Sequence, residues 1–209
     1  TYQAFILFGI CMSYIVTRFL LWKKERILQA FGGIGLMLLL WTFGYFGTSV
    51  YSWFGAIFDL SEYRGLDATA YLENVFSEDA GAIRWLDDTV EGQTVVLEAN
   101  GDSYSDYERV SAMTGLPTVL GWYVHEWLWR GDPAELNVRA DNIKQIYTST
   151  DTSEVLRLLE QYHVTYIFVG SREKEKYGEE LNESLLQSIG DMVYQDSGSG
   201  TYILQVQDT

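Results

Sequence analysis

The sequence has little cysteine, little proline and few basic residues for a chain of 209 residues. Its single cysteine, Cys11, has no partner for an intramolecular disulfide and excludes a cysteine-rich zinc site. With 2 prolines and 47% hydrophobic residues, the composition also excludes an intrinsically disordered chain. Lysine and arginine total 14 against 29 acidic residues, so the formal net charge is -15. Such a chain lacks the basic face that nucleic-acid binders need.

The few basic residues are unevenly distributed along the chain. Residues 1–58 hold four basic residues and one acidic residue, Glu25, whereas the remainder holds ten basic and 28 acidic residues. A composition shift this sharp marks a domain boundary. We place the boundary near Asp59, between a membrane part (residues 1–58) and a second domain (residues 59–209).

Two apolar runs dominate the N-terminal part. Residues 2–22 are long enough to cross a bilayer as a helix, and their one charge, Arg18, lies close enough to the end to reach the interface. A short charged loop, KKER, follows at residues 23–26. The next run is charge-free to residue 58, which is too long for one straight span. We therefore predict a second span at about residues 27–45, then an interfacial segment. Aromatic residues suited to interfacial belts are Trp22, Trp41, Tyr45, Tyr51 and Trp53.

Charge also predicts the topology of the two spans. A signal peptide is disfavoured because no basic region precedes the first run and a second run follows it. A buried core hairpin is the remaining alternative. The positive-inside rule keeps the KKER loop in the cytoplasm, so the acidic domain faces outward as part of a multi-pass cell-membrane protein. Because the chain begins with Thr1, we expect a fragment of a longer polytopic protein.

Periodicity and turn residues predict the elements of the acidic domain. Predicted helices cover residues 79–89, a stretch from Pro133 that is broken before residues 142–147, a helix capped by Thr152 or Ser153, and residues 179–189. Predicted strands cover residues 94–99 and 164–170. A C-terminal hairpin joins residues 192–195 to residues 201–206 through a Ser-Gly-rich turn.

Helices that alternate with buried strands indicate parallel strand pairing, and the hairpin adds an antiparallel edge. We therefore predict a membrane α-helical hairpin followed by a small three-layer α/β domain. Its sheet is expected to be mostly parallel, with the antiparallel hairpin at the C-terminal edge.

Residues 98–130 form the least generic part of the chain. They combine three tryptophans with one of the 2 histidines and with several ionisable residues. The segment begins where a predicted strand runs into a glycine-containing loop, which is where open α/β sheets place ligands.

This segment resembles a known family. The matching stretches are EA at 98–99, GDSY at 101–104, RVS from Arg109, TGLPTVLGW from Thr114, HEW from His125 and WRG from Trp129. Later matches are Arg139, IYT at 146–148, YHVTYI at 162–167 and Val169-Gly170. The stretches and their order resemble the C-terminal region of the YYY family of uncharacterised polytopic membrane proteins. The resemblance covers about residues 80–178, with weaker similarity in the two spans.

The resemblance implies a function. The YYY family is similar to C-type membrane glycosyltransferases, including protein mannosyltransferases, which use lipid-phosphate-linked sugars as donors. Their catalytic carboxylate usually lies in a first external loop, which has no counterpart here. The resemblance therefore implies a fragment that assists recognition of the sugar donor or of a glycan or protein acceptor, without carrying the whole reaction.

Seven side chains of the segment are candidate substrate contacts. Arginine offers a planar fork to a phosphate or carboxylate, tryptophan can stack on a sugar ring, and a histidine–carboxylate pair can move protons. Each type has a structural alternative: ion pairing in the interior, core packing, or orientation of the loop by hydrogen bonds. The candidates are Glu98, Tyr104, Arg109, Trp122, His125, Glu126 and Arg130.

Three further functional alternatives concern metal binding, hydrolysis and scaffolding. The HExxH zinc motif needs a second histidine where this chain has Trp129, so no metal site is predicted, although a divalent cation stays an alternative for the unknown cofactor. Glycan hydrolysis would need two carboxyl groups, such as Glu98 and Asp102 or Glu126, facing one pocket. A non-enzymatic envelope scaffold would bury the whole segment, whereas an open groove beside His125 would favour ligand recognition.

Overall fold

The computed structural model describes residues 2–55 and 69–207. Contacts divide the chain into two compact units, Thr1–Gly65 and Leu66–Thr209, which are treated separately. The predicted boundary near Asp59 lies outside the described residues.

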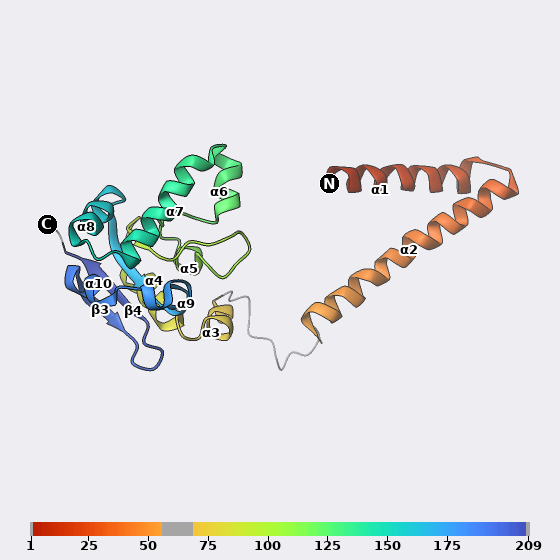
Figure 1. Cartoon of the computed structure of the whole chain (residues 1–209). Coiled ribbons are helices and arrows are strands. Elements are labelled where there is room, and N and C mark those ends of the chain that lie inside the picture. Colours follow the sequence, from red (N-terminus) through yellow and green to blue (C-terminus); the bar gives the residue numbers. More distant parts are fainter. Residues whose placement is uncertain (1, 56–68, 208–209) are drawn as a thin grey trace. The chain divides into compact units, whose positions relative to one another are not determined.

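The N-terminal unit is a helical hairpin (Figure 1). Helix α1 (Tyr2–Thr17) continues into a π-helical turn, η1 (Arg18–Trp22), and α2 (Arg26–Phe54) returns beside them. Among the described residues, one helix, Arg26–Trp53, is long and apolar enough to cross a membrane, and Ile6–Trp22 is a shorter apolar helix. The helix α2 continues past the predicted end at residue 45 to Phe54, so the predicted interfacial segment is helical over that part. No proline or charge interrupts it there.

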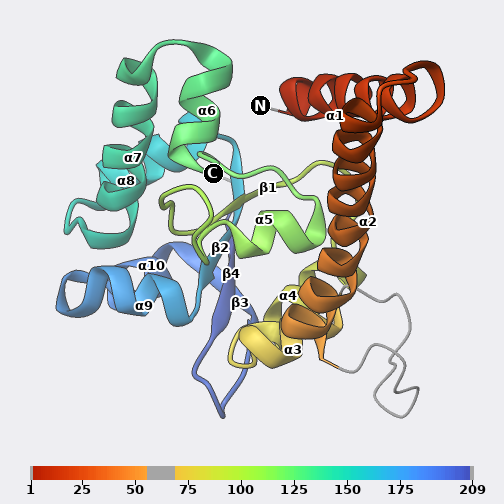
Figure 2. The same ribbon diagram turned by 90° about the vertical axis from the view of Figure 1, so that its right-hand side faces the viewer.

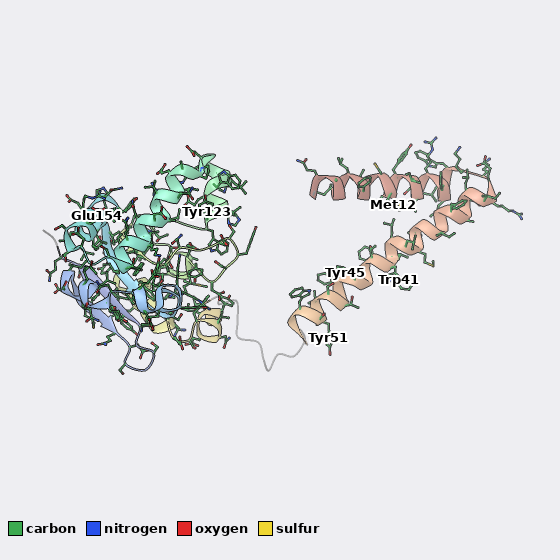
Figure 3. The ribbon with its side chains drawn as sticks, viewed as in Figure 1. Met12, Trp41, Tyr45, Tyr51, Tyr123 and Glu154 are labelled. Atoms are coloured by element: carbon green, nitrogen blue, oxygen red, sulfur yellow. The ribbon has the colours of Figure 1, made fainter. Side chains whose placement is uncertain are left out.

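Small residues bring the two helices together. A Cβ added at Gly32 would lie 2.9 Å from Cγ of Leu20, and one at Gly35 would lie 2.8 Å from Cγ2 of Val16. Glycine at such points lets apolar helices approach closely, as in membrane interfaces. Most other apolar side chains of this unit are exposed, and Figure 3 shows Trp41 and Tyr45 projecting from α2. Such an apolar surface suits lipid better than water, and a buried core hairpin is not what the structure describes.

A four-stranded sheet forms the centre of the C-terminal unit. The strands are β1 (Val95–Leu97), β2 (Val164–Val169), β3 (Gly190–Gln195) and β4 (Tyr202–Val206). The order is β1-β2-β4-β3, with β1 and β2 parallel and the other two pairings antiparallel. The predicted α/β class and C-terminal hairpin are confirmed. The sheet is mixed rather than mostly parallel, because β4 lies between its hairpin partner and β2.

Helices cover both faces of the sheet, which confirms the three layers (Figure 2). Alternate residues of β2 point to opposite sides, so Ile167 packs in one core and Phe168 in the other. On the Ile167 side lie α7 (Pro133–Thr148), α8 (Thr152–Gln161), α9 (Ser171–Tyr177) and α10 (Glu183–Ile189). On the Phe168 side lie α3 (Ala70–Val75), α4 (Ala80–Thr89) and α5 (Arg109–Thr114).

The predicted helices hold with three changes. Helix α4 matches its prediction. The first change is that α7 has no break, because Ile143, Ile146 and Tyr147 continue the buried stripe that begins at Leu136. The cap of α8 is Asp151, whose Oδ1 accepts from the N–H groups of the next turn, rather than Thr152 or Ser153.

The third change concerns the predicted helix 179–189. It is divided into a 3-10 turn at Gly178–Glu180 (η2) and the helix α10, which is capped by Asn182. The sequence patterns did not predict α3, α5, α9 or the exposed α6 (Tyr123–Arg130).

Candidate functional site

The distinctive segment begins directly after β1 and contributes two short helices. A loop leads from β1 to α5, Thr118 then pairs with Val96 in an isolated parallel bridge, and α6 follows. Two non-glycine residues of the loop, Tyr104 and Glu108, have left-handed backbone angles, with φ of 62° and 60°. Such angles are uncommon outside glycine and mark a backbone that its surroundings hold in place.

Arg109 lies in the interior. Its Nε donates to Oδ2 of Asp79 at 2.7 Å, and its Nη2 donates to Oε2 of Glu173 at 2.8 Å. Its guanidinium also lies over the ring of Phe168. The three charged side chains are at most 1% exposed, and we call Asp79, Arg109 and Glu173 the buried ion network.

Backbone and hydroxyl donors complete the buried ion network. Asp79 accepts hydrogen bonds from the backbone and hydroxyl of Ser171 and from the hydroxyl of Thr201. Glu173 accepts from the N–H groups of Ala99 and Gly170. Burial would raise the pKa of Asp79, but Arg109 and the Ser171 donors hold this pKa below its ordinary value. Arg109 therefore joins four segments of the fold and does not reach the surface.

Glu98 also has a structural position. Its two carboxylate oxygens accept from the N–H groups of Val110 and Ser111, at 2.9 and 2.8 Å. These are unpaired donors of the first turn of α5, so Glu98 caps that helix from a distant position in the sequence. Burial raises the pKa of this carboxyl.

A surface pocket of about 530 Å³ lies between α5 and α6. It contains four of the seven predicted contact residues, Trp122, His125, Glu126 and Arg130, and neither Arg109 nor Glu98. We call it the α6 pocket, and its lining residues are Glu108, Ser111, Ala112, Gly121, Trp122, His125, Glu126, Trp129 and Arg130.

Aromatic rings form one wall of the α6 pocket. The Trp122 and His125 rings are stacked, with centroids 5.3 Å apart and planes 27° from parallel. The Tyr104 ring meets the edge of His125 at 5.1 Å and is otherwise 84% exposed. The indole Nε1 of Trp122 donates to the carbonyl of Tyr107, which fixes the ring. The fifth candidate, Tyr104, thus belongs to the same cluster.

An ion pair lies beside these rings. The Nε of Arg130 donates to Oε2 of Glu126 one helical turn earlier. Both side chains are partly exposed, at 49% and 26%. Gly121 passes so close to Glu126 that an added Cβ would lie 3.1 Å from its Oε1. The pair leaves the pocket with one cation offset by one anion.

Glu108 is a pocket residue that the sequence patterns did not single out. It is 5% exposed, its Oε1 accepts from Gly101 N at 2.9 Å, and its Oε2 is buried without a partner among the described residues. The pKa of this carboxyl is raised to about 8, chiefly by burial and also by the neighbouring Glu98. Glu108 has a left-handed backbone, and the sequence gives no signal for this conformation or for the burial.

The α6 pocket offers aromatic faces together with a few polar groups. This combination suits a ligand with an apolar face and hydroxyl groups, such as a sugar ring. The described residues contain no group of three or more histidine, cysteine, aspartate or glutamate side chains arranged to hold a metal ion.

A second pocket, of about 760 Å³, lies elsewhere on the C-terminal unit. Residues of α8 and of the adjoining strands line it, including Arg157, Glu160 and His163. It contains none of the candidate residues and no tryptophan, phenylalanine or tyrosine. It therefore provides matched control positions for the α6 pocket.

Comparisons with known proteins matched this chain to solved structures. No family model matches the chain, and no curated protein matches it. Among solved structures, the chain is similar to the C-terminal globular domain of an oligosaccharyltransferase from Archaeoglobus fulgidus. The TM-score is 0.39 at 12% sequence identity, and the match covers 61% of this chain and 95% of that one.

Proposed function

We propose that the C-terminal unit is the extracytoplasmic domain of a membrane glycosyltransferase-like protein and that its α6 pocket recognises a sugar. The sugar belongs to the lipid-phosphate-linked donor or to the glycan or protein acceptor. The observation that carries the proposal is the open pocket lined by Trp122, His125 and Trp129, beside the Glu126–Arg130 pair.

Exposure of these aromatic residues favours ligand recognition over a scaffold. A scaffold segment would be wholly buried, but Trp129 is 88% exposed and Trp122 lines an open pocket. Both arginines were expected to contact the ligand. We now assign that contact to Arg130 alone, because Arg109 is enclosed by carboxylates. We assign substrate contact to Tyr104, Trp122, His125, Glu126 and Arg130, and a positioning role to Arg109 and Glu98.

The proposal assigns no catalytic base to this domain. A pocket that orients a substrate contributes to rate without supplying the reacting carboxylate. Glycan hydrolysis would require two reacting carboxyls facing one pocket. Glu98 is occupied as a helix cap. Of the two carboxyls that line the α6 pocket, Glu126 is paired with Arg130 and the Oε2 of Glu108 is buried. The domain therefore assists a reaction whose centre lies elsewhere in the assembled protein.

Deletion of the gene in its host tests the proposal. Cell-envelope glycans and glycopeptides are compared by mass spectrometry, and we expect the loss of one defined sugar addition. Complementation with Trp129→Ala or Arg130→Ala should restore transfer at least about tenfold less well than the wild type, since tryptophan and arginine anchors commonly contribute about 2 kcal/mol.

Two matched variants serve as controls for complementation. Leu128→Ala removes an exposed apolar side chain from the same helix but outside the pocket. Arg157→Ala removes an exposed helical ion pair with Glu154 in the second pocket. Both should restore transfer fully. An unchanged glycan profile in the deletion strain, with the protein shown to be expressed in the parent, would instead favour the scaffold function.

The proposed topology has a separate test. Cys11 is the single cysteine, so a Cys11→Ser background carrying Ser199→Cys in the β3–β4 turn has one thiol on the domain. We expect a membrane-impermeant maleimide to label that thiol on intact cells. Labelling only after lysis would reverse the proposed orientation.

A further inference from the structure

Glu108 combines three features that its packing does not explain. It is 5% exposed, its backbone φ is 60°, and its Oε2 has no hydrogen-bond partner among the described residues. Each feature opposes stability, because left-handed angles and unpaired buried oxygens both cost free energy. Groups of this kind cluster at functional sites, and Glu108 lines the α6 pocket.

The charges in the pocket indicate what Glu108 can bind. Arg130 is already paired with Glu126, so the lining residues described here offer no unpaired guanidinium to a phosphate. An ionised Glu108 would repel an anion further, and a neutral one offers a single O–H donor. The pocket is therefore matched to uncharged oxygen atoms and to the apolar face of a sugar ring.

We propose that Glu108 binds the ligand of the α6 pocket as a neutral carboxylic acid, donating a hydrogen bond to a hydroxyl or ring oxygen of an uncharged sugar. The inference rests on the proposed function and specifies it further: the pocket takes the sugar and not the phosphate of a lipid-linked donor. Oε2 is closed to solvent in the unliganded structure, so the carboxyl must turn toward the pocket for the sugar to supply the partner that Oε2 lacks, while Oε1 stays bound to Gly101 N.

The surroundings of Glu108 are compatible with the neutral acid. The pKa of Glu108 is raised to about 8, chiefly by burial and also by Glu98, while the hydrogen bond from Gly101 N, Lys176 and Arg109 act to lower it. The charged and titratable groups around the carboxyl are Glu98 after β1, Arg109 on α5, Lys176 on α9, and His125, Glu126 and Arg130 of α6 across the pocket. A carboxyl with this pKa is mostly protonated at pH 7 and mostly ionised at pH 9.5.

Sugar titrations of the whole chain in nanodiscs test the inference. Nanodiscs avoid glycoside detergents, which would compete for the pocket. The probes are methyl mannoside, methyl glucoside and methyl galactoside, with inorganic phosphate for comparison, and binding is followed by saturation-transfer NMR from pH 7 to 9.5. We expect at least one sugar to bind at pH 7, about tenfold weaker binding at pH 9.5, and no binding of phosphate.

The Glu108→Gln variant distinguishes a donor from a merely structural residue. Glutamine keeps an oxygen for Gly101 N and supplies an N–H donor that does not titrate. It should bind the sugar within about twofold of the wild type at pH 7, with a flat pH profile, whereas Glu108→Ala should bind about 5–10-fold more weakly. Thermal unfolding of each variant shows that its domain is folded.

The outcomes separate this inference from the proposed function. If no sugar binds the wild type, the proposed function fails, and the role of Glu108 fails with it. If sugar binding is lost in Trp129→Ala but Glu108→Ala and pH leave it unchanged, the pocket is correct and the inference about Glu108 is wrong. A pH dependence that persists in Glu108→Gln would assign the titration to another group and overturn the inference, as would tight phosphate binding.

Discussion

Arg109 and Arg130 belong to the same segment of the chain and occupy opposite environments. Arg109 is 1% exposed and bonded to two carboxylates that come from distant parts of the sequence, Asp79 and Glu173. Arg130 is 49% exposed and paired with Glu126 one turn away on its own helix. Both are arginine–glutamate pairs among aromatic residues, yet only the second is open to a ligand.

The difference shows what each arrangement can contribute. A buried charge must have every partner in place, so the buried ion network fixes the register of α4, α5, α9 and the end of β1. A partly exposed surface pair contributes little to stability. Arg109 therefore belongs to the structural framework, whereas the recognition that we propose falls to Arg130.

The largest expected effect comes from breaking the buried ion network. Arg109→Ala leaves Asp79 and Glu173 buried without their cation and should lower the free energy of unfolding by about 3–5 kcal/mol. Urea unfolding monitored by circular dichroism measures the change, with Arg157→Ala as a surface control that should leave the midpoint unchanged. A wild-type midpoint in Arg109→Ala would show that the network does not stabilise the domain.

A smaller loss is expected from the cap of α5. Glu98→Gln replaces an acceptor oxygen with an N–H group that faces the donors of Val110 and Ser111, so the domain should lose about 1–3 kcal/mol. Hydrogen exchange at these two amides should accelerate more than exchange at the amides of α8. Equal acceleration in both helices would refute a local capping role.

The pH dependence of the free energy of unfolding should differ in sign between Glu108 in the pocket and Asp79 in the buried ion network. The Glu108 pKa is raised from 4.5 to about 8, so its contribution is complete below pH 4.5 and declines as pH rises to 8. The expected decline is up to about 1.4 kcal/mol per pH unit, and Glu108→Gln should remove it. Asp79 has the opposite sign: its pKa is lowered from 3.8, so its contribution holds above 3.8 and is lost in acid.

Urea unfolding at several pH values between 5 and 8 measures this decline. Because the contribution of Asp79 is constant in that range, the difference between the wild type and Glu108→Gln isolates Glu108. Parallel profiles for the two proteins would show that Glu108 ionises normally in the folded domain.

The smallest effect is expected at the surface pair. Arg130→Ala removes a partly exposed i,i+4 pair and should change the free energy of unfolding by at most about 0.5 kcal/mol. The same urea experiment detects whether the change is larger. A loss comparable to that of Arg109→Ala would place Arg130 in the structural framework and remove the contrast between the two arginines.

Sequence patterns predicted the elements whose signal is local. Continuous apolar runs predicted the helical N-terminal part, and the Ser-Gly-rich turn between two alternating segments predicted the β3–β4 hairpin. Predictions were less accurate where a neighbour in space decides the outcome. Asp151 caps α8 from one residue further back, and β4 inserts beside β2 and makes the sheet mixed.

The candidate site, too, was predicted in part from the sequence and decided in part by the tertiary structure. The composition of residues 98–130 was enough to locate the region, and five of its seven candidates, Tyr104, Trp122, His125, Glu126 and Arg130, gather around one pocket. The sequence by itself determined which side chains were present and which elements carry a strong periodic or turn signal, because those properties depend on near neighbours. Only the tertiary structure decided that Arg109 and Glu98 are enclosed and that Glu108 lines the pocket, because burial and charge partners come from residues distant in the chain.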